Sequence, residues 1–481
     1  MKRLLFLIPL IICSCNDWLD VQPEASVSAE ELFSTEEGFF EAINGVYTRC
    51  NDNYFYGGLF SVEILDVMAQ NYSFNVQDYT NYQKTSTFDF TDATLRWRNE
   101  QIWSIGYNAI VNANLILENI DAHQDVFHAG MYELVKGEAL ALRAYIHFDL
   151  LRYFALPYAT GASTEAIPYV TTYSNKVTAL STVQEVVGRV TDDLKAARAL
   201  LATADPILSD DYVVGYNTDA ETVSTEMSNT NLFLQNRRHR LNYYAVCATL
   251  ARAYLYTGNT SEAYAMAREV IEAQKFPWVN VDDFLAAEQT RDRLMYTEII
   301  FGWYAENRIT DMEARYENTV TGYFIHGDHA ASIYETALAG ADDIRFKGWF
   351  FQTSNDRQII KYLRNSEEVG NRHYLIIPAI RLSEMYYIAA EAVYNSDPAA
   401  AATLLNEVRT HRGIRVALDK DCNFVDELLR EYRKETYAEG QSFYAYKRLG
   451  RNIVAENGAP YLPSVIAPVP LPDAEIEFGN R

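Results

Sequence analysis

Apolar residues recur at helical spacing along most of the chain, and the helical segments come in pairs. The clearest pair lies within residues 241–277, where small and apolar residues share one face: Leu250, Ala251, Tyr254, Gly258, Ala263, Ala267 and Val270. Small residues let two antiparallel helices approach closely, and Gly258 turns the chain between them. Because each helix has an apolar stripe that only a neighbour can cover, we expect the pairs to stack on one another.

The spacing in this pair is that of a tetratricopeptide repeat, and other segments have a related amphipathic pattern. They are residues 28–47, 102–120, 137–154, 181–201, 380–394, 398–412 and 426–450, the last as a broken helix. Pro157 ends one of these segments, because proline cannot continue a helix. Gly413 ends another, because glycine readily adopts the backbone conformation that closes a helix. The pattern predicts a mainly α fold with a helical scaffold at about residues 28–50, 101–204, 241–274 and 379–450.

Two long stretches between the helices have no regular period. Residues 51–99 are rich in Tyr, Asn, Asp and Thr, and residues 275–378 mix short apolar runs with Tyr, Trp, Asp and Gly. Stretches of this length are usually either functional or disordered. Their aromatic content favours ordered segments, so we predict that both excursions from the scaffold face a ligand.

The N-terminus has the pattern of a targeting segment. Lys2 and Arg3 precede an apolar run at residues 4–12, which is far shorter than the roughly 20 residues needed to span a bilayer. Ser14-Cys15 follows, a small residue before a cysteine as in a bacterial lipobox. We therefore predict that residues 1–14 are a lipoprotein signal peptide, that Cys15 is lipidated, and that residues 15–481 form a single domain. The alternative is a soluble exported protein with an incidental cysteine.

Composition narrows the range of partners. The chain has 41 basic and 65 acidic residues, a net charge of −24, and such a surface repels nucleic acid. Aromatic residues make up 13%, with Tyr well ahead of Phe, which favours a recognition surface in addition to a core. Cys50, Cys247 and Cys422 are widely spaced, which argues against a disulfide framework but leaves one disulfide open.

The two excursions contain the residue types that a sugar site needs. A sugar has an apolar C–H face and a polar rim, so its site combines flat aromatic rings with directional polar groups. The candidate ligand-binding residues are Asn75, Tyr79, Tyr82, Arg96 and Trp97 in the first excursion, and Trp303 and Tyr304 in the second. Trp103 lies at helical spacing with Tyr107, so we assign it to the core.

Enzymatic and metal-dependent interpretations have less support. The adjacent Asp pairs of the chain, such as Asp342-Asp343, cannot flank a glycosidic bond as separated acid and base groups must. His326 and His329 could bind a metal, but no third ligand has a recognisable spacing. We predict no catalytic residues, no metal and no cofactor.

Short motifs follow one another along nearly the whole chain. They include CNDWLDVQP at residues 15–23, EAINGVY at 41–47, EALALRAY at 138–145, LPY at 156–158, RLSE at 381–384 and EG at 439–440. In this order the motifs resemble the SusD/RagB family of outer-membrane nutrient-binding lipoproteins of Bacteroidetes. The resemblance implies a SusD-like fold, with tetratricopeptide-like helix pairs on one side and irregular ligand-facing excursions on the other.

The resemblance also implies a function. A SusD-like protein would be lipid-anchored in the outer membrane through Cys15, face the cell exterior, capture an oligosaccharide and pass it to a SusC-like TonB-dependent transporter, without catalytic activity. Capture of peptides or glycopeptides by the same fold, as in RagB, is the main alternative. A glycoside hydrolase or a bare scaffolding repeat protein is a weaker one.

Overall fold

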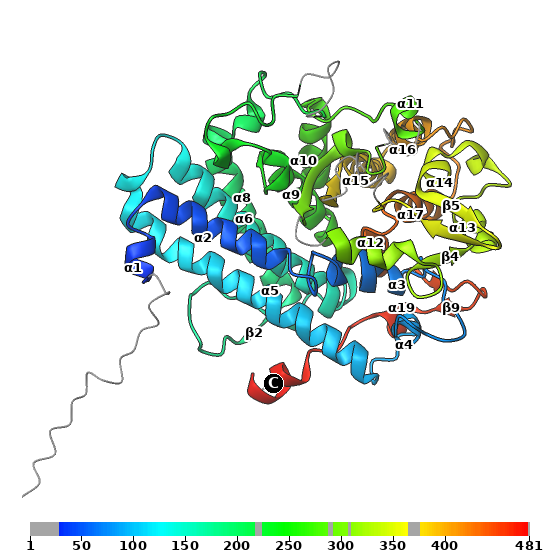
Figure 1. The fold of residues 1–481 in the computed structure, drawn as a ribbon, viewed down its shortest axis with the longest axis horizontal. Helices are drawn as coiled ribbons and strands as arrows, with labels where there is room; N and C mark the ends of the chain where they lie inside the picture. The colour runs from blue at the N-terminus through cyan, green and yellow to red at the C-terminus, as the bar shows by residue number, and fades with distance from the viewer. Residues whose placement is uncertain (1–27, 217–223, 287–291, 306–308, 364–375, 480–481) are drawn as a thin grey trace, which may run out of the picture.

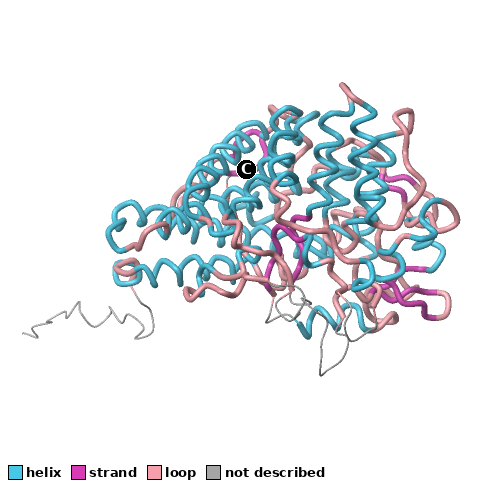
Figure 2. Tube along the Cα trace, turned by 90° about the horizontal axis from the view of Figure 1, so that it is seen from above, coloured by secondary structure: helices cyan, strands magenta, loops and turns pink. Residues whose placement is uncertain are grey.

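Helix is the main secondary structure of the protein. The computed structural model describes residues 28–216, 224–286, 292–305, 309–363 and 376–479. Figure 2 shows helices along the whole length of the molecule, with short strands scattered among them. The predicted mainly α fold is therefore confirmed. The predicted signal peptide and Cys15 lie outside the described residues.

One side of the molecule is built from long helices packed on one another (Figure 1): α2 (Glu36–Cys50), α5 (Ala93–Ile120), α6 (Met131–Phe154) and α8 (Val183–Ala204). Helix α6 packs along both α5 and α8, and α2 packs along α5. Thr182 and Glu185 form a reciprocal capping box at the start of α8, which satisfies backbone N–H groups that have no partner within the helix. Residues 137–154 and 181–201, both predicted to be helical, thus pack on each other as α6 and α8.

The stack continues through further antiparallel helices: α9 (Tyr243–Thr257), α10 (Thr260–Glu272), α15 (Leu382–Tyr394), α16 (Pro398–His411), α17 (Phe424–Glu435) and α18 (Gln441–Arg448). Helix α9 packs on α8 and α10, and α10 packs on α15, which packs on α16. Gly258 closes α9 with φ of +79°, a left-handed conformation that glycine adopts without steric cost. The predicted stacking of helix pairs is confirmed.

The two excursions, the connecting segments and the two ends of the described chain contain short elements that no sequence period indicates. The short helices are α1 (Ala29–Leu32), α3 (Ile64–Met68), α4 (Gln83–Ser86), α7 (Tyr158–Gly161), α11 (Val281–Phe284), α12 (Ile309–Glu317), α13 (Gly327–Ile333), α14 (Ile344–Trp349), α19 (Pro463–Ile466) and α20 (Asp473–Phe478). Elements of four to nine residues are too short to show a helical or alternating pattern reliably.

The strands form small antiparallel sheets. β3 (Ile299–Tyr304) pairs with β7 (Ile376–Arg381), and β6 (Asp356–Ile359) lies between β4 (Phe324–His326) and β5 (Phe350–Thr353). Two further pairs are β1 (Glu165–Pro168) with β2 (Leu180–Thr182), and β8 (Ile453–Val454) with β9 (Pro460–Tyr461). The second excursion therefore carries most of the sheet structure.

Helix α5 begins earlier than the hydrophobic pattern predicts. The pattern starts at residue 102, whereas the helix starts at Ala93, after the Asp92 side chain accepts a hydrogen bond from the Leu95 backbone N–H at 2.9 Å. The first two turns are mostly polar, with Leu95 fully buried, so they lack an apolar stripe. Consequently Arg96 and Trp97 lie on a rigid helix and not in an irregular segment.

Buried ion pairs join parts of the scaffold to one another and to the second excursion. Arg381, at the end of β7, donates to the Glu439 carboxylate, which also accepts from Lys361, and all three side chains are buried. Arg252 of α9 binds Glu384 of α15 at 2.5 Å. Arg381, Glu384 and Glu439 all belong to the motifs noted in the sequence, so these motif residues have a structural role.

Two negative findings hold for the described ranges. None of their helices combines the length and the hydropathy that crossing a bilayer requires. Cys50, Cys247 and Cys422 are free thiols, which settles the possibility of a disulfide that the sequence left open.

Candidate functional site

A glycine-containing turn after α2 presents an aromatic side chain to solvent. Within residues 51–58, Asp52 accepts a hydrogen bond from the Tyr54 backbone N–H at 2.9 Å. A side chain at Gly57 would lie 2.2 Å from the Asn51 carbonyl oxygen, so the close chain reversal requires glycine there. The turn leaves the Tyr54 side chain 43% exposed.

Tyr54 forms an exposed aromatic pair with Trp97. The two rings are 5.2 Å apart in an edge-to-face arrangement at 79°, and Trp97 is 45% exposed on the first turns of α5. Large aromatic rings are normally covered, and this pair is held in place by a helix on one side and a tight turn on the other. The pair therefore offers exposed aromatic surface of fixed orientation.

A second exposed ring lies beside the same turn. Tyr304, the last residue of β3, is 38% exposed and stacks on His239, with ring centres 5.0 Å apart and an angle of 7°. The Asn51 side chain donates a hydrogen bond to the Tyr304 backbone carbonyl at 2.7 Å. One turn thus connects the Tyr54–Trp97 pair to the Tyr304–His239 pair.

Burial lowers the pKa of His239 to about 4. Its ring is therefore neutral at physiological pH, and its Nε2 lies 3.3 Å from the Tyr296 hydroxyl. A neutral, hydrogen-bonded imidazole supports the Tyr304 ring as a flat platform without adding charge.

We call Tyr54, Trp97, Tyr304 and His239 the aromatic surface. At its edge the Arg49 guanidinium lies 3.4 Å from the Asp52 carboxylate, with both side chains partly exposed. Flat rings next to exposed charged groups can contact the apolar face of a ring-shaped ligand and hydrogen-bond its polar rim.

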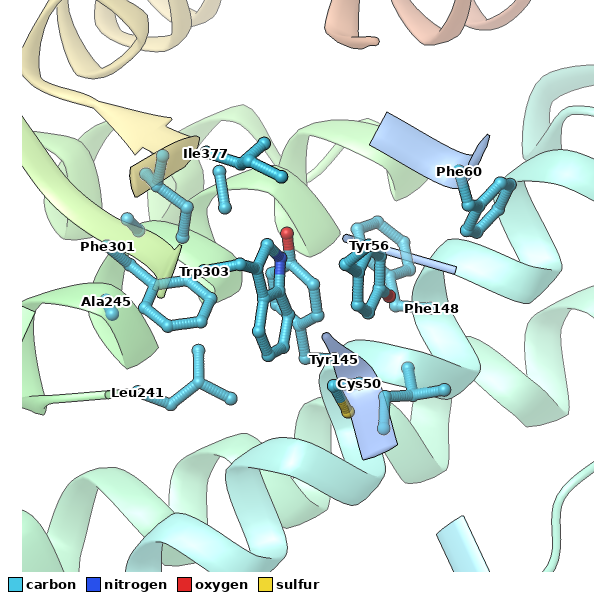
Figure 3. Close-up of a cluster of buried hydrophobic side chains, with 14 of the residues drawn as sticks. Cys50, Tyr56, Phe60, Tyr145, Phe148, Leu241, Ala245, Phe301, Trp303 and Ile377 are labelled. Carbon is cyan, nitrogen blue, oxygen red and sulfur yellow. The ribbon is translucent and has the colours of Figure 1, made fainter. Parts of the chain in front are cut away.

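The structure places Trp303 in the core. Trp303 is 1% exposed and stacks on Tyr56 at 4.4 Å, with Tyr145 and Phe301 packed edge-on (Figure 3). Successive residues of a strand point to opposite sides, so β3 directs Trp303 inward and Tyr304 outward. Of the two adjacent candidates, only Tyr304 is available to a ligand.

Tyr82 is also buried, at 2% exposed. Its hydroxyl donates to Glu63 at 2.5 Å, and the Arg98 guanidinium lies 3.5 Å from its ring centre. Burial, and next the charge of Glu63, raise the pKa of Tyr82 well above its usual value. These contacts give Tyr82 a packing role.

The remaining candidates lie near the surface but are bound to other parts of the chain. Asn75 donates to the Val320 carbonyl at 3.0 Å, which ties the first excursion to the second. Tyr79 is 50% exposed, with its hydroxyl on Gln77, and Arg96 forms an ion pair with Asp473 of α20. None of the contacts described for these three residues joins them to the aromatic surface.

Sequence reasoning did not identify Tyr54, Asn51 or His239. The available signal for Tyr54 was its place in a polar, glycine-containing segment directly after a helix, because connecting segments run over the protein surface. His239 had no comparable signal, since its importance comes from contact with a residue 65 positions further along the chain.

The two histidines considered as metal ligands, His326 and His329, both contact the Glu456 carboxylate. His326 Nδ1 lies 2.6 Å from a Glu456 oxygen, and His329 Nδ1 lies 3.5 Å from the other. Across the described ranges, no group of three His, Cys, Asp or Glu side chains is arranged to hold a metal ion.

Two family models together match most of the chain. One, described as starch-binding and associating with the outer membrane, matches residues 17–208, and the model of the SusD family matches residues 211–465. The chain belongs to the SusD family. Proteins of this family are binding proteins without catalytic activity.

Individual relatives are more distant. SusD-like protein P38 of Formosa agariphila is 28% identical over 216 residues, which cover 43% of this chain and only 38% of that protein. A SusD superfamily protein of Bacteroides thetaiotaomicron superimposes with a TM-score of 0.70 at 19% identity, covering 93% of this chain and 98% of that one. A SusD-like carbohydrate binding protein of Bacteroides vulgatus gives 0.70 at 17% identity, covering 93% and 97%. At these identities the two structures show that the fold is shared.

Proposed function

We propose that this protein captures oligosaccharides on its aromatic surface. The observation that carries the proposal is the exposed, rigidly held pair of Tyr54 and Trp97, joined through one turn to Tyr304. A sugar ring that stacks on such a surface buries its C–H face against the aromatic rings, while the Arg49 and Asp52 side chains at the edge can bind hydroxyl groups.

Family membership and fold support a carbohydrate ligand. The matching family model is described as starch-binding, and a protein of the same fold is a carbohydrate binding protein. We further propose that lipid on Cys15 anchors the protein to the outer membrane, facing the exterior, and that it delivers its ligand to a SusC-like TonB-dependent transporter. The acidic surface, with net charge −24, supports lipid anchoring because it would not by itself attract an anionic membrane.

Isothermal titration calorimetry of the protein with a panel of oligosaccharides and peptides tests the proposal. We expect at least one oligosaccharide class to bind, and Trp97→Ala to weaken that binding by about tenfold or more, since an anchoring aromatic contributes more than about 1.4 kcal/mol. Tyr54→Ala should weaken the same ligand, because it removes the other half of the ring pair.

Tyr173→Ala is the matched control. Tyr173 is 52% exposed, similar to Trp97, and its backbone N–H donates to Glu118, which is about 30 Å along α5 from Trp97. This variant should bind like the wild type. Unchanged affinity in Trp97→Ala would refute the placement of the site, and binding of peptides but no glycan would refute the ligand class.

A further inference from the structure

A second hollow lies inside the helical scaffold and shares no residue with the aromatic surface. It is a cavity of about 40 Å³ whose wall includes side chains of α6, α9, α15 and α18. Pro157, Lys447 and Arg448 also line a larger, mainly apolar surface groove of about 340 Å³. Lys447 therefore lies where the cavity meets a route to solvent.

The cavity contains one positive charge without a counterion. Three of its cations are guanidinium groups that each bind a carboxylate: Arg152 with Asp149, Arg252 with Glu384, and Arg448 with Glu391. The fourth is the Lys447 ammonium, which is buried and donates to the Tyr153 backbone carbonyl at 2.6 Å. Among the residues that the structure describes, no carboxylate lies within ion-pair distance of Lys447.

Three further polar groups of the wall have no hydrogen-bond partner in the described part of the chain. They are the Tyr444 hydroxyl, on a side chain that is 5% exposed, the Arg152 Nε and the Arg252 Nη1. Buried polar groups in folded proteins are nearly always hydrogen-bonded, so donors left over at one place indicate a missing acceptor. Burial and the nearby Arg152 lower the pKa of Lys447 to about 7, as expected when a buried cation lacks a counterion.

We propose that this cavity binds a small carboxylate, which accepts hydrogen bonds from the Lys447 ammonium and the Tyr444 hydroxyl. A monoanion balances the single excess positive charge. The size also fits. A water-sized group needs about 10–15 Å³ of cavity volume, so a cavity of 40 Å³ holds three or four such groups. This is the number of heavy atoms in formate or acetate. This proposal is independent of the proposed glycan binding.

The carboxylate can belong to a free small acid or to the end of a longer ligand. In the second case the remainder follows the adjoining groove, whose lining includes the apolar side chains of Leu156, Leu449 and Ala467. Comparing acetate with hexanoate distinguishes the two, because only a groove-bound chain gains affinity from added CH₂ groups.

Thermal unfolding of the full chain, titrated with sodium acetate or hexanoate against sodium chloride at constant ionic strength and pH 6.5, tests the proposal. We expect a saturable rise in Tm with a carboxylate and none with chloride. Lys447→Met should abolish the rise. Tyr444→Phe, which removes only one oxygen atom, should weaken the apparent affinity about fivefold or more, since it deletes a hydrogen bond to a charged group.

Lys420→Met is the control, because Lys420 is a solvent-exposed lysine with its side chain 63% exposed, and it should respond like the wild type. If Lys447→Met does not fold, Tyr444→Phe alone decides. The proposal would be overturned if a carboxylate raised the Tm of Lys447→Met or of Tyr444→Phe as much as that of the wild type. It would also be overturned if neither acid raised the Tm of the wild type.

Discussion

Replacing Arg345 by Met would break the buried ionic cluster that attaches the second excursion to the scaffold. Arg345, on α14, lies 2.7 Å from Asp343, 3.0 Å from Glu431 and 2.9 Å from Glu435, and all four side chains are fully buried. Glu431 and Glu435 belong to α17, so one guanidinium joins the two parts of the fold.

The magnitude follows from the charge balance of the cluster. The buried carboxylates are matched by buried cations, so removing Arg345 leaves one negative charge uncompensated, which typically costs about 3–5 kcal/mol. The pKa of Glu431 shows the size of the effect that the cations of the cluster have together. Burial alone would raise the pKa of Glu431. Three neighbouring cations, Lys434, Arg345 and Arg409, instead hold this pKa at about 2, against an ordinary value of 4.5. At 1.36 kcal/mol per pKa unit, the folded state favours this carboxylate by about 3 kcal/mol.

Urea denaturation at pH 7 and at pH 4 measures the effect. We expect Arg345→Met to lower the free energy of unfolding by about 3 kcal/mol at pH 7. The difference from the wild type should shrink at pH 4, because the uncompensated carboxylate of the variant can then take up a proton. The wild type itself should lose stability as the pH falls from 4.5 toward 2, since the Glu431 pKa is depressed in the folded state.

A surface substitution provides the reference. Lys420→Met removes the exposed ion pair with Asp421 and should change the free energy of unfolding by less than about 0.5 kcal/mol. A loss below about 1 kcal/mol in Arg345→Met at pH 7 would show that the cluster is not energetically coupled in the way its geometry indicates.

Three further predictions concern other parts of the molecule. Trp303→Ala should lower the free energy of unfolding by about 3–5 kcal/mol, whereas Tyr304→Ala should cost under about 1 kcal/mol in the same urea titration, and equal costs would contradict the assignment of one ring to the core and the other to the surface. Hydrogen bonds from His329, Ser73 and His326 outweigh the effect of burial and hold the pKa of Glu456 at about 2, so the amide protection factors of the β8–β9 hairpin, measured relative to intrinsic exchange at each pH, should fall as the pH falls from 4.5 toward 2. Glu456→Gln should remove this pH dependence, and an unchanged profile would contradict it. Cys15→Ala should shift the protein from the membrane fraction to the soluble fraction of cells and abolish labelling with palmitate, and retention in the membrane would contradict lipid anchoring through Cys15.

Local physical chemistry made much of this fold predictable from sequence. The pair α9–α10 follows from small residues at fixed offsets and from Gly258, all within 37 residues of one another. The polar start of α5 could not be placed by hydrophobic spacing, because the Asp92 cap and a single buried leucine determine it. The short strands of the second excursion depend on pairing with distant partners, as β3 does with β7.

The candidate site shows the same division. The sequence by itself determined which segments are aromatic and that they leave the helical scaffold. Only the tertiary structure decided that Trp97 is exposed and Trp303 is buried, although both lie in the aromatic-rich excursions. The reason is that exposure depends on contacts with remote segments: Tyr56 and Tyr145 cover Trp303, while Trp97 stays 45% exposed beside Tyr54.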